Sequence, residues 1–137
     1  KKMHKLSENY KAIELFPITD IASATTTNGT GVDCLGLRDD LVAVVQLGAM
    51  TGTHTCDVTI QESDASGSGY AAISGAVFTQ TDANSDNTIA CIGFKRTKRY
   101  VRASIVTAGT VTSNIIGISG LIKAEEGKVD LNSATAA

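Results

Sequence analysis

The stretch HTCDVTIQES, residues 54–63, decides the fold class because its polarity changes from one residue to the next. Cys56, Val58 and Ile60 fall on one side of an extended chain, and the polar residues between them fall on the other. A period of two residues is typical of a β-strand that buries one face and leaves the other in solvent. The stretch therefore predicts a half-buried strand.

Similar stretches, separated by Gly, Asn, Asp and Ser, recur from residue 30 to residue 123. The predicted strands cover residues 31–37, 41–49, 54–63, 70–75, 76–81, 88–94, 99–107 and 111–125. No helical pattern separates them, so the crossovers that a parallel sheet needs are missing. We expect an all-β domain, an antiparallel β-sandwich or jelly roll of about seven or eight strands, with a small barrel as the alternative.

One predicted strand differs from the others in its outer residues. LVAVVQLGA, residues 41–49, is nearly continuously apolar and does not alternate. A strand of this kind is typical of a position that is covered on both faces. We therefore expect residues 41–49 to be buried on both sides.

The composition fits one β-rich domain. The chain has 137 residues, of which 42% are hydrophobic but only 4% are aromatic, so aliphatic side chains must build the core. No apolar run approaches the roughly 20 residues that cross a bilayer. The basic N-terminal segment has no continuous apolar stretch of the kind found in a secretory signal. We expect no membrane partner, and synthesis in the cytoplasm.

An apolar stripe marks the N-terminal segment. Its members are Leu6, Tyr10, Ile13 and Phe16, spaced four, three and three residues apart. This spacing is typical of one helical face, and Pro17 would end such a helix. The segment is predicted to be a short helix or an arm that becomes ordered against a partner.

These patterns divide the chain into three parts. Residues 1–29 are predicted to form the N-terminal arm or short helix, and residues 30–125 the β-sandwich domain. Residues 126–137 are small and polar, which predicts a flexible C-terminal tail.

Positive charge is concentrated in FKRTKRYVRASI, residues 94–105, although the whole chain has a net charge of -2. The basic residues of this run are Lys95, Arg96, Lys98, Arg99 and Arg102. Residues 39–94 carry seven acidic side chains and no Lys or Arg, whereas residues 95–123 carry six basic side chains and no acidic one. A nucleic-acid binder normally has a basic excess over the domain, so no nucleic-acid partner is expected. The run is either a solvated turn and strand, or a contact between oppositely charged surfaces of two copies.

The candidate catalytic and metal-binding residues are few. His4 lies in the predicted arm, and His54 is expected to be an exposed strand residue. DANSDN, residues 82–87, has alternating oxygen donors but lacks the Gly and Glu of a calcium loop. Glu62 and Asp64 lie in one turn, and nothing in the sequence shows them to be a glycosidase pair. We expect no catalytic site, no metal and no cofactor, and hence no enzyme.

Three cysteines, Cys34, Cys56 and Cys91, are far apart in the sequence. An odd number without close pairs argues against a disulfide framework and against a zinc site. We expect all three to be small buried hydrophobic residues.

Three stretches resemble a family of small virion proteins of tailed bacteriophages. They are VTIQESDASGSGYAAISG at 58–75, FKRTKRYVRASIVTAGT at 94–110 and IIGISGLI at 115–122. Members of the family often show a V-x-V-Q-E-S-D strand, a Gly/Ser turn that ends in an aromatic residue, the sequence T-K-R-Y-V-R, and a final apolar strand. The resemblance covers roughly residues 41–123, and Tyr70 stands where the family commonly has Trp.

The resemblance implies a structural virion protein, most plausibly a decoration or cement protein that binds the outer capsid surface. It implies the major capsid protein as partner, self-association that is often trimeric, and a location on the virion. The basic run and the apolar stripe are then the candidate subunit or capsid contacts. A neck, tail or fibre-associated protein is the alternative within the virion, and a carbohydrate-binding β-sandwich is the alternative outside it.

Overall fold

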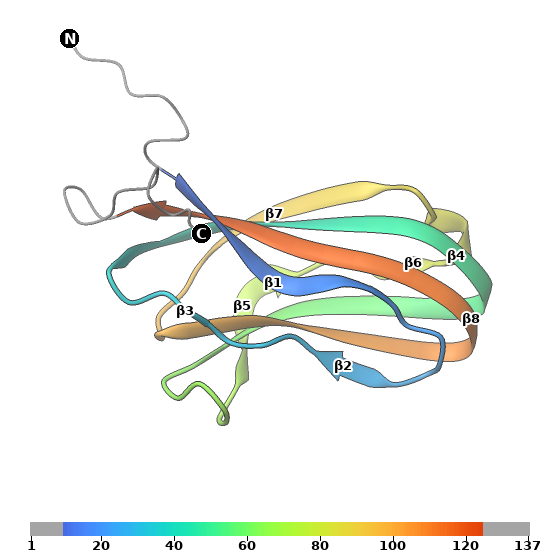
Figure 1. Ribbon diagram of the computed structural model, residues 1–137, viewed down its shortest axis with the longest axis horizontal. Helices are drawn as coiled ribbons and strands as arrows, with labels where there is room; N and C mark the ends of the chain where they lie inside the picture. The colour runs from blue at the N-terminus through green and yellow to red at the C-terminus, as the bar shows by residue number, and fades with distance from the viewer. Residues whose placement is uncertain (1–9, 125–137) are drawn as a thin grey trace, which may run out of the picture.

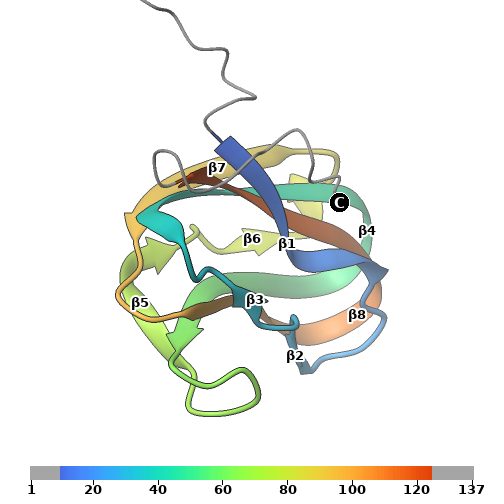
Figure 2. The same cartoon turned by 60° about the vertical axis from the view of Figure 1, so that its left-hand side comes forward.

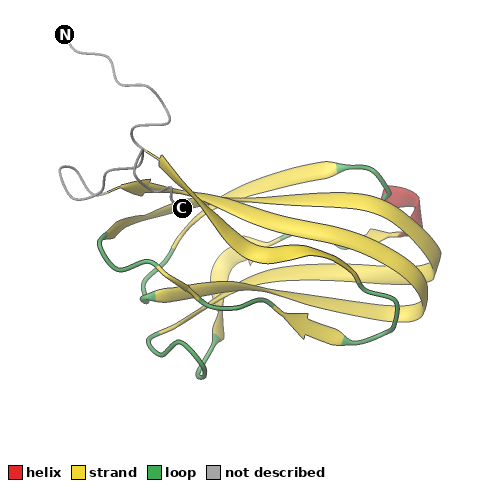
Figure 3. Cartoon of the chain, in the orientation of Figure 1, coloured by secondary structure: helices red, strands yellow, loops and turns green. Residues whose placement is uncertain are grey.

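The protein is an all-β antiparallel sandwich, which confirms the predicted fold class. The computed structural model describes residues 10–124 (Figure 1). Its elements are β1 Tyr10–Asp20, β2 Thr26–Asn28, β3 Val32–Asp33, β4 Leu37–Ser63, β5 Ala71–Val77, β6 Thr81–Asp82, the 3-10 turn η1 Ala83–Ser85, β7 Ile89–Lys95 and β8 Tyr100–Ala124. The short η1 turn is the single helical element of the described part (Figure 3). No helix within residues 10–124 is long and apolar enough to cross a membrane.

Two very long strands organise the sandwich. β4 has 27 residues and β8 has 25, and they pair from Leu37 opposite Ala124 to Ser63 opposite Tyr100. This two-stranded ribbon folds over near its middle, so that its two halves lie in different layers (Figures 1 and 2). We call Leu37–Met50 of β4 with its β8 partners the first half of the ribbon, and Thr51–Ser63 with its partners the second half.

Each half of the ribbon gains strands on both sides. In the first layer β1 pairs with the first-half part of β8, and β7 pairs with the first-half part of β4. In the second layer β2 and β3 pair with β8, and β5 and β6 pair with β4. Every pairing is antiparallel.

Two glycines allow the ribbon to fold over. Gly52 has a φ of 124° and Gly109 a φ of 106°, a region that favours glycine. A Cβ atom on Gly52 would lie 2.3 Å from the carbonyl oxygen of Thr110, and one on Gly109 would lie 2.6 Å from that of Thr53. The sequence predicted separate strands with turns here, whereas both strands continue through the bend with register shifts.

The core lies between the inner faces of the two layers. Cys56, Val58 and Ile60 are buried, as their alternation predicts, and so are Val101 and Ile105 on the paired strand. Aliphatic side chains make up most of the core cluster.

The N-terminal stripe forms a strand, so the helix predicted there is wrong for its described residues. β1 pairs with β8, with register shifts on both sides of Phe16. Such bulges turn extra side chains inward, and here Leu15 and Phe16 are both buried although they are adjacent. A three-residue spacing fits a bulged strand as well as a helix.

Residues 10–29 therefore belong to the sandwich, to which they contribute β1 and β2, and do not form a separate arm. Leu6 and the tail predicted at residues 126–137 lie outside the described residues.

Candidate functional site

The outer face of the first layer is apolar. Seven large hydrophobic side chains are exposed among the described residues, and four of them lie here: Ile18 (83%), Val42 (37%), Ile89 (66%) and Leu121 (39%). Val42 is paired with Leu121 on one side and with Gly93 on the other, so these residues share one face. We call this surface, formed by the outward residues of β1, β8, β4 and β7, the apolar face.

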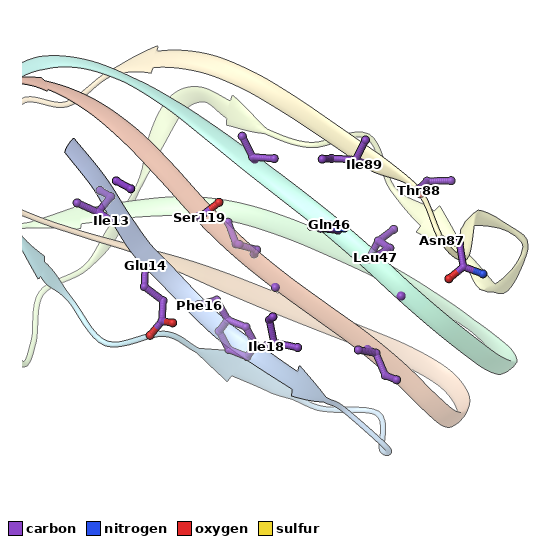
Figure 4. A pocket seen from close by; sticks show the side chains of 16 residues that line it. Ile13, Glu14, Phe16, Ile18, Gln46, Leu47, Asn87, Thr88, Ile89 and Ser119 are labelled. Atoms are coloured by element: carbon purple, nitrogen blue, oxygen red, sulfur yellow. The ribbon is translucent and has the colours of Figure 1, made fainter. Parts of the chain in front are cut away.

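A groove of about 770 Å³ crosses the apolar face. Ile18 on β1 and Ile89 on β7 lie on opposite sides of it, with β8 and β4 between them (Figure 4). Glu14, Gln46 and Ser119 are polar side chains among the lining residues. The groove is thus a mainly apolar hollow with a few hydrogen-bonding groups.

Two glycines help to form the groove. A Cβ on Gly117 would lie 2.8 Å from Cγ1 of Ile18, and a Cβ on Gly48 would lie 3.1 Å from Cγ2 of Ile115. Both isoleucines belong to neighbouring strands and lie across the sheet at these positions. Because the glycines have no side chains, Ile18 and Ile115 have room beside them on this face.

Opposite charges mark the two ends of the apolar face. At one end lie Lys95 on β7 and Lys123 on β8, which outnumber Asp40, the β4 residue opposite Lys95 in the strand register. At the other end Asp20 closes β1 and Asp86 follows the η1 turn before β7. The two ion pairs of the described residues are elsewhere, between Lys98 and Asp64 and between Arg99 and Asp33. Lys95, Lys123 and Asp86 are therefore charged groups without an ion pair inside the described chain.

Arg96 is held inside the chain by backbone carbonyls. Its guanidinium donates hydrogen bonds to the carbonyl oxygens of Cys34 at 2.8 Å, Leu37 at 2.6 Å and Lys98 at 2.9 Å. A fourth bond, from Nε, reaches the carbonyl oxygen of Arg38 at 3.2 Å. The described contacts of Arg96 thus tie the turn before β4 to the loop before β8.

Glu62 fixes the same loop from the second half of the ribbon. Its carboxylate accepts hydrogen bonds from the Thr97 amide at 2.7 Å, the Thr97 hydroxyl at 2.8 Å and the Lys98 amide at 3.1 Å. Burial alone would raise the pKa of Glu62, but the hydrogen bonds from Thr97 and Lys98 outweigh it and lower the pKa. The loop is therefore shaped by a charged group that stays ionised.

Arg99 and Arg102 are also engaged within the chain. Arg99 forms a two-pronged ion pair with Asp33, with both N–O distances at 2.8 Å. The hydrogen bond from Arg99 lowers the pKa of Asp33 to about 2. Arg102 donates to Gln61 at 2.9 Å, and its guanidinium carbon lies 4.0 Å from the ring centroid of Tyr70.

The structure divides the predicted contact residues among different environments. Lys95 lies at the end of the apolar face, and Arg96 is held by carbonyls. Lys98 and Arg99 lie in the loop before β8, and Arg102 lies in β8 in the second layer. Of the apolar stripe, Ile13 and Phe16 are buried in the core of their own chain, and Tyr10 is half-buried. Whether the basic residues touch another subunit or a capsid stays a prediction.

His54 is buried (4% exposed), so its predicted exposure is wrong. His54 lies on the same side of β4 as Cys56, and its Nε2 lies 3.1 Å from Oδ1 of the fully buried Asn114. Nδ1 is buried without a hydrogen-bond partner in the described part of the chain. The backbone N–H of Asn114 donates a hydrogen bond to the carboxylate of Asp20 at 3.0 Å. The alternation of residues 54–63 puts His54 on the same side as Cys56, Val58 and Ile60, which is the signal for its burial, whereas the polar imidazole favours exposure.

The three cysteines are free thiols, and their positions differ. Cys34 and Cys56 are buried as predicted, and burial raises the pKa of each thiol. Cys91 is exposed opposite Val44 on the apolar face, so its predicted burial is wrong. Within residues 10–124, no cluster of three His, Cys, Asp or Glu side chains could hold a metal ion.

Solved structures with a similar fold include proteins of phages and viruses. The PBSX exported protein XepA matches with a TM-score of 0.62 and 16% identity, over 94% of this chain and 42% of XepA. The structure of infectious bursal disease virus, Gx strain, matches with a TM-score of 0.53 and 11% identity, over 89% and 33% of the two chains. The VP2 subviral particle of the same virus matches with a TM-score of 0.50 and 14% identity, over 86% and 33%.

The chain spans less than half the length of these proteins, and at such identities the likeness shows the fold alone. No protein-family model and no curated protein sequence matches the chain.

Proposed function

We propose that this protein is a structural component of a tailed-bacteriophage virion that decorates the outer surface of the capsid and stabilises it by binding. The observation that carries the proposal is the apolar face, a surface for association with a further copy of the chain or with the capsid protein. Monomeric soluble proteins rarely expose a large contiguous apolar surface, and such surfaces mark sites of protein association. A sandwich whose inner core is already complete has no use for this face in its own folding.

Binding energy is the proposed mechanism. Apolar surface that is covered in the assembled particle contributes roughly 25 cal/mol per Å² removed from water. A protein that binds only the assembled state shifts the equilibrium toward that state. The chain would therefore raise the free energy needed to separate neighbouring subunits, and this role needs neither a catalytic residue nor a cofactor.

The strand order supports a jelly-roll interpretation of the sandwich. The first layer has the order β1-β8-β4-β7, and the second has β2 and β3, then β8 and β4, then β5 and β6. A ribbon of paired strands that folds over into two four-position layers is the arrangement of a double Greek key. Jelly rolls of this kind occur in viral capsid domains.

The proposed partners are the major capsid protein and further copies of the chain. Lys98 and Arg99, in the loop before β8, are the candidates for the capsid contact, and Lys95 at the end of the apolar face is the candidate for a contact between copies. The trimer expected from the family resemblance stays a prediction. A neck, tail or fibre-associated position is the alternative location within the virion.

The aromatic side chains argue against a carbohydrate-binding function. All six aromatic residues of the chain lie in the described part, and each is buried or half-buried. Tyr70 and Tyr100 are in addition covered by the guanidinium groups of Arg102 and Arg99. Sugar-binding sandwiches usually offer an open aromatic surface, which these residues do not form.

The test uses virions of the phage that encodes this chain. Gold-labelled antibodies against the protein should mark the head surface, and particles from a deletion mutant should open at a lower temperature than wild-type particles. Label confined to the neck or tail would replace decoration by the alternative location. Purified particles that contain none of the protein would refute the virion function.

A further inference from the structure

We propose that the apolar face binds the same face of a second copy of this chain, so that two protomers pack through their first layers. The inference rests on the proposed function, since it names the partner that covers this surface. The second layer of each copy and the loop before β8, residues 96–99, stay free to meet the capsid.

The first argument is shape. Ile18 is a strongly exposed side chain beside a groove on the same surface (Figure 4). A contact between identical faces about a twofold axis gives each copy both features, so the Ile18 side chain of one copy can enter the groove of the other. The apolar rows of Val42, Val44 and Leu121 then pack against one another as the two inner faces of a sandwich do.

The second argument is charge, and it also fixes the orientation. A twofold axis that runs across the strands places β7 of one copy over β7 of the other in the opposite direction. Lys95 at the end of β7 then meets Asp86, which lies just before the start of β7 in the other copy, and this pair occurs twice. In the same arrangement Lys123 of one copy lies over the end of the second copy that carries Asp20. An axis parallel to the strands would instead place the two lysine-bearing ends together, with Asp40 as the acidic residue there, and the excess of positive charge disfavours it.

The third argument is area. Four strands about 4.8 Å apart, each contributing eight or nine residues at about 3.4 Å, give a footprint of roughly 500 Å² per copy. The pair would bury about 1,000 Å² in total, which lies at the lower limit for a specific interface. The contact is therefore expected to be reversible and to depend on protein concentration, as suits a component that adds to a shell.

The first experiment measures the solution mass of the full chain by light scattering over a range of concentrations. Wild type is expected to reach twice the mass of the variant Ile18→Lys with Ile89→Lys, because a lysine in the contact would be desolvated without a partner. The control is Val77→Lys, which replaces an exposed apolar residue on the second layer and should leave the mass unchanged. A factor of two is expected whether or not a trimer forms through another surface.

The second experiment tests the orientation by charge reversal. Lys95→Glu and Asp86→Lys should each weaken the pairing roughly tenfold or more, and the double variant should restore it. Circular dichroism checks that each variant is folded. A double variant that pairs no better than the single ones would refute the orientation across the strands.

The outcomes separate the two proposals. A wild-type mass that never exceeds that of the double-lysine variant refutes the pairing, even if antibodies label the virion. A mass that falls by half in that variant supports the pairing, even if the virion carries none of the protein. A monomer that loses capsid binding through Ile18→Lys with Ile89→Lys would assign the face to the capsid and overturn the pairing.

Discussion

The two halves of the β4–β8 ribbon have outer faces of opposite character. In the second half Asp57, Thr59 and Gln61 point outward. Gln80 donates a hydrogen bond to Asp57 at 2.9 Å, and Arg102 donates one to Gln61 at 2.9 Å. In the first half the outward positions hold Val42, Val44 and Leu121. The backbone pairing is the same in both halves, so the difference lies in the side chains. The exposed apolar residues of the second layer, Val77 and Val106, stand beside Thr59 and Asp57, whereas those of the first half form one apolar face.

The sequence contains this contrast in two short stretches. Residues 54–63 alternate, whereas residues 41–49 are apolar at almost every position. The second pattern predicts burial on both faces, and the described chain buries only the inner one. The outer face of residues 41–49 is predicted to be buried but is exposed in the single chain, and this difference is the reason for proposing that another protein chain covers it.

The largest expected effect comes from breaking the bend that joins the two halves. Gly52→Ala or Gly109→Ala would bring a Cβ atom to within 2.3 or 2.6 Å of a backbone carbonyl oxygen at a positive φ. Because backbone atoms of the paired strand cannot move away cheaply, we expect each variant to lose about 3 kcal/mol or more of unfolding free energy. Denaturant titration of the purified variants measures the loss.

Gly67→Ala is the matched control for these variants. Its Cβ would meet no atom within 4 Å, and it lies in the turn after β4. We expect a change within about 0.5 kcal/mol. A loss at Gly52 or Gly109 no larger than that of the control would show that the ribbon does not need glycine to fold over.

An intermediate effect is expected at the end of the second half of the ribbon, where Glu62 accepts hydrogen bonds from the loop before β8, residues 96–99. Glu62→Gln keeps the shape but removes the charge that accepts three hydrogen bonds, so we expect a loss of about 1–2 kcal/mol near neutral pH. Asp64 is an exposed carboxylate 3.9 Å from Lys98 of the same loop, so Asp64→Asn should cost less unfolding free energy than Glu62→Gln.

The pH dependence of this effect has a definite sign. The pKa of Glu62 is lowered in the folded protein, so its contribution to stability is present above the unfolded value and is lost as the pH falls through the folded pKa. The stability difference between wild type and Glu62→Gln should therefore shrink in acid. A difference that is constant from pH 7 into the acid range would contradict the role assigned to the carboxylate.

The sequence predicted features that depend on neighbours along the chain and missed those that depend on distant contacts. The alternation at Cys56, Val58 and Ile60 identified their inward side, because strand geometry alone decides it. The sequence predicts breaks between strands at residues 50–53 and 108–110, because glycine is typical of turns, whereas both strands continue through the bend there. The role of Arg96 could not be predicted, since the Cys34 carbonyl that it binds is 62 residues away in the chain.

The smallest expected effect concerns the exposed ion pair between Arg99 and Asp33. Such a pair contributes little in water, so Arg99→Gln should cost less stability than Glu62→Gln. The pKa of Asp33 is lowered from 3.8 to about 2, and the pair therefore stabilises the fold above the higher value and ceases to do so as the pH falls through the lower one. NMR titration of the Asp33 carboxyl should show its pKa rise in Arg99→Gln, with Arg102→Gln as the control that leaves it in place. An Asp33 pKa that does not move would mean that the two side chains are not paired in solution, and Arg99 would then be available to a capsid or a second subunit.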